Sequence, residues 1–568
     1  MKFKQNEQKN NEIYEYLKPY PINKIRIPDS AIITKQILDK LTNDSSENLY
    51  ILALAINIVA APNEKIQFFL SLINKTINIS TAEAVEIFNK INNQNMSLVS
   101  QELINELKFI LNVSRAEERG FIYDEKKQTY SFNANVCAKH LIKRCDIYSI
   151  KDGRLFFYHK GGFYDELSVV KLGKIIRTVL HEGRSNSWKS QHEQEIVKAL
   201  QREAKCVEDM NMEKDVINLK NGILNLDTFE ILAHNPQYLS TIQLPISYDN
   251  KALAPRFIQF LKEITCGDNE LIVVIQEMIA YLLSSDMKAE KAFFLLGSGA
   301  NGKSVLTTII TYLIGKDNIS SIPLSEFNKQ FGLEGIINKK VNIAAENEMG
   351  GKSLNTENFK AIISGDNIEI NIKYKPSISY RPTCKLVFVT NNLPDTLDIT
   401  NGFFRKIMII PFLRTFKPEE RNVNLTNELL EELPGILNWA IEGLKRLREN
   451  NFIFSKCKVI EEYTNNYCLE QNPVKEFFME HVKVAKDCKT KQSDFYKKYI
   501  YWLALQGIDD KGTKAVQTFW KNFKIVLENE QIKINRKKVT GVYYYDGIDI
   551  VGLDDRRNSF IDQHNIQF

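Results

Sequence analysis

Residues 291–313 limit what this chain can fold into more than any other stretch of it. Ala292–Leu296 is a short apolar run, typical of a buried strand, and apolar residues at helical spacing begin near residue 303. Between them lies Gly297-Ser298-Gly299-Ala300-Asn301-Gly302-Lys303-Ser304, which fits the pattern G-x-x-x-x-G-K-[ST]. The order of strand, glycine-rich turn and helix predicts an α/β nucleotide-binding fold.

The chemistry of this turn gives its residues separate roles. Small residues let backbone N–H groups wrap around phosphate oxygens, and the N-terminus of the following helix adds positive potential. Lys303 can reach the β- and γ-phosphates, and the Ser304 hydroxyl can ligate Mg²⁺. The sequence therefore predicts a bound nucleoside triphosphate with Mg²⁺.

Two carboxylates follow the next strand-like run, residues 341–345. They are Glu346 and Glu348. Hydrolysis needs a carboxylate near the phosphates, and one of the two can hold the water shell of the metal while the other orients the attacking water. We favour Glu346 for the metal and Glu348 for the base, although the two roles can be exchanged. The alternative is a pair of solvated loop acids.

Two later strands are flanked by polar residues. The apolar run 385–390 leads into Asn391, whose amide can sense the γ-phosphate and help to place the water, although Asn-rich turns are common. Arg405 directly precedes the apolar run 406–412. An isolated arginine there suggests a finger that completes the site of a neighbouring subunit. A surface salt bridge is the simpler alternative.

Residues 368–382 alternate apolar and polar side chains, which predicts a β-hairpin. Its tip holds Lys373, Tyr374 and Lys375. Lysines contact phosphates whatever the base sequence, and a tyrosine can stack or wedge against a base. From these residues alone, a solvated hairpin is the alternative.

The end of the chain has a pattern of its own. Helical periodicity at 474–481, 493–505 and 516–528 precedes two strand-like runs between 533 and 550, and three helices with a β-ribbon are typical of a winged-helix domain. Residues 511–540 hold eight basic and two acidic side chains. This excess favours duplex DNA binding, with Arg536, Lys537 and Lys538 at the phosphates, over a solvated basic face.

The length of 568 residues predicts several domains. We divide the chain into a helical region without motifs at 1–125, a collar region at 126–255, a motor at 256–450 and the winged-helix region at 451–568. The net charge of +5 says little about partners. Eight cysteines without metal-ligand spacing argue against structural zinc and favour a reducing compartment. Without a secretory signal or a membrane span, a cytoplasmic protein is expected.

Taken in order, the motifs resemble superfamily 3 helicases. They run from the glycine-rich turn through Glu346, Glu348, Lys360, Gly365-Asp366, Lys373 and Asn391-Asn392-Leu393-Pro394 to Arg405 and Pro411-Phe412. The likeness is strongest to the D5-like, phage and plasmid P4-type branch, because residues 218–249 resemble the D5 N-terminal region. In detail, the chain resembles replication initiator helicases of staphylococcal-type mobile genetic islands. The resemblance covers about residues 132–553.

The resemblance implies an AAA+-like motor that uses ATP, a hexameric ring with ATP sites at subunit boundaries, and 3′→5′ movement on single-stranded DNA. It assigns Asn391 to sensor 1 and Arg405 to the finger, and it places the 368–382 hairpin in the ring channel. For Lys360 it suggests a DNA or intersubunit contact, against the simpler alternative of helix-surface charge. Some viral relatives have two adjacent acids where Asn347 separates Glu346 from Glu348, so their division of labour stays open.

We therefore expect an ATP-dependent DNA helicase and replication initiator of a mobile genetic element. Its expected partners are single-stranded and duplex DNA, including an origin, further copies of itself in a homo-hexamer, and an accessory or loader protein. A helicase-primase is one alternative, but the first 200 residues show neither closely spaced carboxylates on a strand nor a zinc module. The other is a non-translocating NTPase scaffold, whose ATPase activity would ignore DNA.

Overall fold

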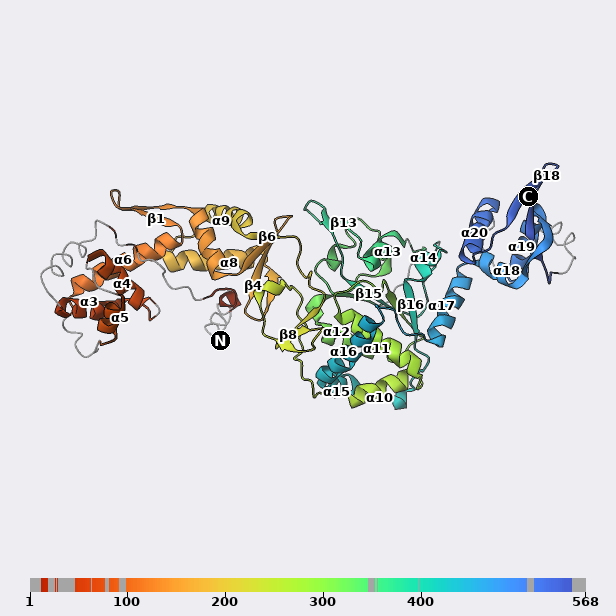
Figure 1. Ribbon diagram of the computed structural model, residues 1–568, viewed down its shortest axis with the longest axis horizontal. Coiled ribbons are helices and arrows are strands. Elements are labelled where there is room, and N and C mark those ends of the chain that lie inside the picture. The colour runs from red at the N-terminus through yellow and green to blue at the C-terminus, as the bar shows by residue number, and fades with distance from the viewer. Residues whose placement is uncertain are drawn as a thin grey trace. The chain divides into compact units, whose positions relative to one another are not determined.

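The computed structural model in Figure 1 describes residues 12–18, 26, 28, 46–62, 64–76, 81–90, 99–345, 353, 354, 356–396, 398–507 and 515–553. The chain divides into two compact units. The first unit is Met1–Met212 with His234–Thr241, and the second is Glu213–Ala233 with Ile242–Phe568. Among the described helices, none combines the length and the apolar character that a membrane span requires.

Residues 46–118 of the first unit contain four helices among the described residues, in keeping with the helical region that the sequence predicts. The helices are α3 (Ser46–Val59), α4 (Lys65–Thr76), α5 (Thr81–Asn89) and α6 (Gln101–Glu118). Ser100 caps α6, because its side chain accepts a hydrogen bond from the Leu103 backbone N–H. All four helices contribute buried side chains to one core.

The rest of the first unit combines helices with a four-stranded sheet in the order β5-β4-β3-β6. A turn at Gly161-Gly162 joins β4 to β5, where His159 pairs with Phe163. A separate two-stranded ribbon, β1-β2, precedes the sheet in the chain. The elements are β1 (Phe121–Asp124), β2 (Thr129–Phe132), α7 (Ala134–Arg144), β3 (Ile147–Ile150), β4 (Leu155–His159), β5 (Phe163–Glu166), α8 (Val169–Gly183), α9 (Ser190–Glu203) and β6 (Lys205–Val207).

A small antiparallel sheet, β7-β8-β9, opens the second unit. Its strands are β7 (Val216–Leu219), β8 (Gly222–Asn225) and β9 (Ile231–Leu232). A turn at Asn221-Gly222 joins the first two of these strands. A Cβ on Gly222 would lie 2.4 Å from the Leu232 carbonyl oxygen, so the close approach of β9 requires glycine at this position.

Five parallel strands form the central sheet of the second unit, in the order β11-β12-β15-β10-β16. They are β10 (Ala292–Leu296), β11 (Ile319–Ser320), β12 (Val341–Ala344), β15 (Lys385–Thr390) and β16 (Ile407–Pro411). The four longer strands lie where the sequence predicts them. β15 lies between β10 and β12, and the three strands are parallel. The segments that follow these strands therefore start next to one another, at the edge of the sheet that the carboxyl ends of the strands form.

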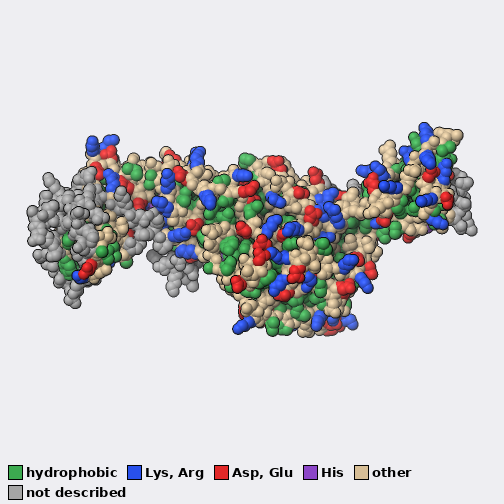
Figure 2. Space-filling model, viewed as in Figure 1, with side chains coloured by type: hydrophobic (Ala, Val, Ile, Leu, Met, Phe, Trp, Pro, Cys, Tyr) green, Lys and Arg blue, Asp and Glu red, His purple; other side chains and the backbone are tan. Residues whose placement is uncertain are grey.

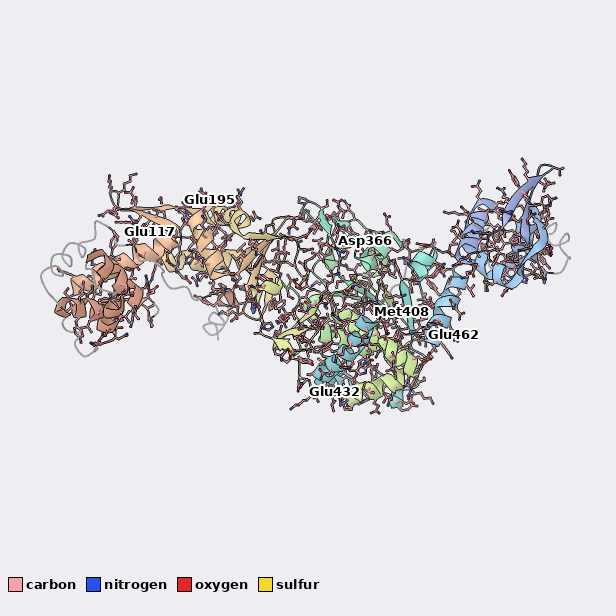
Figure 3. All side chains as sticks on the ribbon, in the orientation of Figure 1. Glu117, Glu195, Asp366, Met408, Glu432 and Glu462 are labelled. Carbon is pink, nitrogen blue, oxygen red and sulfur yellow. The ribbon has the colours of Figure 1, made fainter. Side chains whose placement is uncertain are left out.

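Helices cover both faces of this sheet, so it forms the middle of three layers. Along β10, Phe293 and Leu295 pack into one core, while Ala292 and Phe294 pack into the other. Met408 of β16, labelled in Figure 3, belongs to the first core. The helices of that core include α10 (Pro255–Ile264), α11 (Asn269–Leu283), α12 (Lys303–Ile314), α15 (Leu425–Glu431) and α16 (Leu433–Glu449). The helices of the second core include α13 (Thr356–Ser364), α14 (Asn401–Phe404) and α17 (Lys458–Glu470).

The C-terminal module, residues 473–553, has three helices and three strands among its described residues. They are α18 (Pro473–His481), β17 (Val482–Lys491), α19 (Gln492–Leu505), α20 (Val516–Asn529), β18 (Asn535–Val539) and β19 (Val542–Ile550). The helices and the β18-β19 ribbon lie where the sequence predicts them. The expectation of only two strands is wrong, because β17 pairs with β19 to give the antiparallel order β17-β19-β18. Few large apolar residues mark residues 482–491, so their alternation is weak.

Candidate nucleotide site

The glycine-rich turn connects the end of β10 to the start of α12. Gly299 and Gly302 adopt φ angles of 111° and 92°, in the left-handed region that favours glycine. A Cβ on Gly302 would also lie 2.6 Å from Ile264 Cγ2 of α10. Gly302 is therefore required both by its backbone and by the close packing of α10 against the turn.

Lys303 lies at the first position of α12, with 6% of its surface exposed. Its ammonium group donates hydrogen bonds to the Gly297 carbonyl oxygen and to Asn391 Oδ1, the latter over 3.4 Å. Burial lowers the pKa of Lys303 from its usual value, because apolar surroundings disfavour the charged form. The parallel order of β10 and β15 thus brings together the lysine and the amide for which the sequence predicts phosphate contacts.

Ser304 is exposed in the first turn of α12, beside Lys303. In nucleotide sites, Mg²⁺ takes one or two protein oxygens and completes its shell with phosphate oxygens and water. A single hydroxyl next to a phosphate-binding turn is such a donor. The described residues therefore fit the predicted Mg²⁺.

Glu346 and Glu348 lie outside the described residues, so their roles stay predictions. The strand before them, β12, is present and pairs with β15. Ala345 lines the same cavity as Lys303. The chain therefore reaches the cavity at the residue before the two acids.

The cavity over the carboxyl ends of β10 and β15 has a volume of about 1180 Å³. Its lining has three parts. The first is the glycine-rich turn with the start of α12, and the second is Ala345 with residues 389–395. The third part combines α10 with the chain between β16 and α15.

The third part of the lining was not predicted from the sequence. Phe416 donates its backbone N–H to the Ala300 carbonyl over 2.8 Å, and the Arg421 guanidinium donates twice to the Phe416 carbonyl, at 3.2 Å each. Arg256, at the start of α10, donates to Glu263 Oε1 over 3.3 Å. Only tertiary contacts bring these residues to the cavity. No sequence motif therefore marks them.

Glu432 fixes the end of α10 that faces this cavity. Its carboxylate accepts hydrogen bonds from the backbone N–H groups of Arg256 and Phe257, over 3.1 and 2.9 Å. A carboxylate at a helix N-terminus satisfies otherwise unpaired N–H groups and complements the helix dipole. The contact ties α10 to the junction of α15 and α16.

Arg405 is placed at the opposite edge of the sheet from the cavity. β10 and β16 run parallel, with Ala292 opposite Ile407, and the Ala292 N–H donates to the Lys406 carbonyl over 2.8 Å. Arg405 therefore lies at the amino ends of the strands, about 16 Å of strand away from the glycine-rich turn. Its side chain is exposed. Arg405 does not join the cavity of its own chain.

Lys360 forms an ion pair with Asp398, with 2.7 Å between Nζ and Oδ2. The other carboxylate oxygen of Asp398 accepts from both the backbone N–H and the hydroxyl of Thr400, the residue that precedes α14. Burial acts to raise the pKa of Asp398, but hydrogen bonds from Lys360, Thr400 and Thr356 outweigh it and lower the pKa. Lys360 therefore supports the short helix that ends at Arg405.

The hairpin predicted at residues 368–382 is formed by β13 (Ile368–Ile370) and β14 (Ile378–Tyr380). Tyr374, at its tip, is 93% exposed, and the Lys373 ammonium lies 5.2 Å from the centre of its ring. Lys373 and Lys375 are exposed as well. Because β14 leads directly into the start of β15, the hairpin leaves the sheet at the amino ends of its strands (Figure 1).

The three basic residues predicted to contact DNA on β18 are all exposed, but they do not share a face. Arg536 and Lys538 flank Tyr543, with 3.8 and 5.3 Å to the centre of its ring. Lys537 points to the other face and pairs with Asp546 over 2.7 Å, which lowers the pKa of Asp546.

Two family models match parts of this chain. Residues 139–266 match the family described as "D5 N terminal like". Residues 295–406 match the "Family of unknown function (DUF5906)". The second match begins just before the glycine-rich turn and extends just beyond Arg405.

Similar curated proteins include two from viruses. The first is "Putative helicase L207/L206" of Acanthamoeba polyphaga mimivirus, 24% identical over 258 residues, which are 38% of this chain and 26% of the relative. The second is "Putative helicase 184R" of Invertebrate iridescent virus 6, 23% identical over 342 residues, which are 52% of this chain and 35% of the relative. The comparisons support a D5-like helicase family. The chain spans between about a quarter and a third of the length of these two relatives.

Among solved structures, the apo structure of the NrS-1 C terminal region is similar to this chain. Its sequence identity is 12% and its TM-score 0.43, and the similarity covers 72% of this chain and 97% of that chain.

Proposed function

We propose that this chain is an ATP-dependent DNA helicase of superfamily 3, with an AAA+-like motor in its second unit. The observation that carries this proposal is the strand order β11-β12-β15-β10-β16. It places Lys303 against Asn391 in one cavity, beside the strand that leads to Glu346 and Glu348. A glycine-rich turn alone would support only nucleotide binding, whereas this combination supports hydrolysis.

In the proposed reaction, the backbone of residues 297–302 surrounds the phosphates of ATP and Lys303 neutralises charge on the β- and γ-phosphates. Ser304 would hold Mg²⁺, and the bound ion would supply positive charge against the phosphate oxygens. Glu346 would support the metal and Glu348 would orient the attacking water, or the two would exchange roles. Asn391 fixes the position of that water from the end of β15.

The position of Arg405 supports catalysis between subunits. An arginine at the amino edge of the sheet cannot reach the cavity of its own chain, but it can meet the cavity of a neighbour packed head to tail. Such heterologous contacts close into rings. We propose a homo-hexamer in which Arg405 serves as the finger for the next subunit, and the anchored α14 holds it in place.

The same edge carries the β13-β14 hairpin. We assign Lys373, Tyr374 and Lys375 to the ring channel, where lysines contact the phosphates of single-stranded DNA and Tyr374 contacts a base. The direction of movement, 3′→5′, follows from the resemblance to superfamily 3.

For the C-terminal module, the order α18, β17, α19, α20, β18, β19 supports a winged-helix domain. We propose that it binds duplex DNA at a replication origin, with Arg536, Lys537 and Lys538 near phosphates. This makes the chain a replication initiator of a mobile genetic element. Residues 1–125 are candidates for contact with an accessory or loader protein. The eight free cysteines fit a reducing, cytoplasmic setting.

The proposal is tested by strand displacement on a forked duplex with purified protein. We expect unwinding that needs ATP and that is lost in Lys303→Ala. An ATPase activity that ignores DNA, without strand displacement, would instead support a non-translocating NTPase scaffold.

A further inference from the structure

The sheet of the C-terminal module has an inner face that packs on its helices and an outer face. Tyr545 of β19 stacks on Trp520 of α20, with 5.1 Å between ring centres, so it belongs to the inner face. Successive side chains of a strand point to opposite faces, which puts Tyr544 on the outer face. Lys489 of β17 lies on that face too, because its ammonium is 4.5 Å from the centre of the Tyr544 ring.

Strand register brings two more lysines to Tyr544. It pairs with Lys491 of β17 on one side and with Lys537 of β18 on the other. Side chains directly opposite each other in antiparallel strands share a face, so both lysines flank the ring. Lys489 and Lys537 are exposed, and Lys491 and Tyr544 are half-buried. We call these four residues the outer basic face.

The charges of this face are only partly neutralised. Asp546 pairs in register with Lys489, but its carboxylate forms an ion pair with Lys537. The charge of Lys489 also acts on Asp546, but within the described part of the chain neither Lys489 nor Lys491 forms an ion pair with a carboxylate. These two ammonium groups on one strand, with a tyrosine beside them, can therefore receive an anionic ligand.

The outer basic face contrasts with α20, the helix that a winged-helix domain would place in a DNA groove. The exposed positions of α20 include Gln517, Lys521 and Lys524, and Lys524 is within 3.5 Å of Glu528. A projecting helix fits the major groove of a duplex. A β-sheet face with an aromatic ring among cations suits an unpaired strand, whose bases can stack and whose phosphates can contact lysines.

We propose that the outer basic face binds single-stranded DNA, with Tyr544 stacking on a base and Lys489 and Lys491 contacting phosphates. The inference rests on the proposed function, since a helicase produces such strands. It gives the C-terminal module a second DNA surface, on the opposite face of the sheet from Arg536, Lys538 and Tyr543 and separate from α20. Lys537 is the one residue that it shares with the proposed duplex contacts. Figure 2 shows Lys and Arg side chains gathered over this module.

A simpler role for these lysines follows from their place on an edge strand. β17 has one unpaired edge, and lysines on such strands discourage pairing with other chains. This alternative predicts that removing Lys489 and Lys491 promotes self-association and leaves DNA affinity unchanged. The two roles therefore predict different DNA affinities for a variant that lacks Lys489 and Lys491.

The test measures binding of the full chain to a labelled oligothymidylate of roughly 20 nucleotides, a length that exceeds one site on a small domain. Fluorescence anisotropy is recorded without nucleotide at several salt concentrations. For Lys489→Ala with Lys491→Ala, we expect about tenfold weaker binding, and a slope of log affinity against log salt that is shallower by about 1.4, because each lost phosphate contact removes about 0.7. Tyr544→Ala should weaken binding by about tenfold and Tyr544→Phe by less than about twofold, because phenylalanine keeps the stacking surface.

Lys521→Ala with Lys524→Ala is the matched control, because it removes two exposed lysines from the same module. We expect it to weaken single-strand binding by less than about twofold. Equal losses in the two double variants would overturn the inference. Unchanged binding in the sheet variant would overturn it as well and would favour the edge-strand role. If the wild type shows no ATP hydrolysis, the proposed function fails on its own, whatever the sheet variants bind.

Discussion

The two edges of the central sheet differ in what they present. At the carboxyl edge, Lys303 and Asn391 are held together over a cavity, and the ammonium group of Lys303 is buried. At the amino edge, Arg405 and Tyr374 are exposed and do not line that cavity. In the proposed assembly, one chain contributes a nucleotide cavity from its carboxyl edge and an arginine from its amino edge. The amino edge of one chain packed on the carboxyl edge of a neighbour would therefore complete the active site.

The largest effect is expected from Lys303→Ala, at the carboxyl edge. It removes the only cation that the glycine-rich turn itself supplies, so both ATP binding and turnover should fall, with a loss of about 10⁴ in kcat/KM. Lys316→Ala, just beyond the far end of α12, is the control and should retain wild-type turnover. Steady-state ATPase assays measure both. Turnover by Lys303→Ala at more than a tenth of the wild-type rate would contradict the site.

Arg405→Ala should affect the amino edge without disturbing the cavity of its own chain. We expect the affinity for ATP to stay within about twofold, while kcat falls by about 10³, because a finger acts on charge in the transition state. Binding of a fluorescent ATP analogue and ATPase assays separate the two quantities. Lys288→Ala removes another exposed cation ahead of β10 and should leave kcat unchanged. Normal turnover in Arg405→Ala would show that this arginine is a surface residue.

Lys373→Ala should separate DNA movement from ATP hydrolysis. The side chain lies at the exposed hairpin tip, so basal ATPase should stay within about twofold, while strand displacement should fall by about tenfold or more. Lys329→Ala, an exposed lysine of the same unit that pairs with Glu326, is the control. Wild-type unwinding by Lys373→Ala would remove this residue from the channel.

Asp398→Asn should give the smallest effect, since it acts through α14. We expect kcat to fall by about tenfold with ATP binding kept, because Arg405 loses support for its helix. The pKa of Asp398 lies below its usual value of 3.8 in the folded chain. Its contribution to stability is therefore complete above the unfolded pKa and is lost as pH falls through the folded pKa. Thermal melts should show a deficit of the variant at neutral pH that shrinks in acid, and a deficit independent of pH would contradict this role.

Sequence patterns predicted the features that depend on residues close together in the chain. The strand, glycine-rich turn and helix at 292–314, the strands before Asn391 and after Arg405, and the hairpin tip at Tyr374 all lie where periodicity and turn residues predict them. Each of these features is encoded within about two dozen neighbouring residues or fewer. The contact between Lys303 and Asn391 could also be predicted, because the carboxyl ends of parallel strands lie at a common edge of the sheet.

Features that depend on distant contacts were not predicted. Lys360 is paired with Asp398, but the two residues are 38 positions apart in the chain, and no local sequence pattern links them. Phe416 and Arg421 line the cavity through backbone contacts, which leave no side-chain pattern. The strand β17 was missed because an edge strand rich in lysine lacks the alternation of apolar residues on which strand prediction depends.

The account's central claim is that an active site is shared between two chains, with Lys303 from one edge and Arg405 from the opposite edge of a neighbour. The most direct measurement is the ATPase activity of Lys303→Ala and Arg405→Ala proteins, each alone and mixed in equal amounts. A shared site predicts that the mixture regains activity, because random assembly joins an intact cavity to an intact arginine at about a quarter of the interfaces. A mixture no more active than the two proteins assayed apart would contradict the claim.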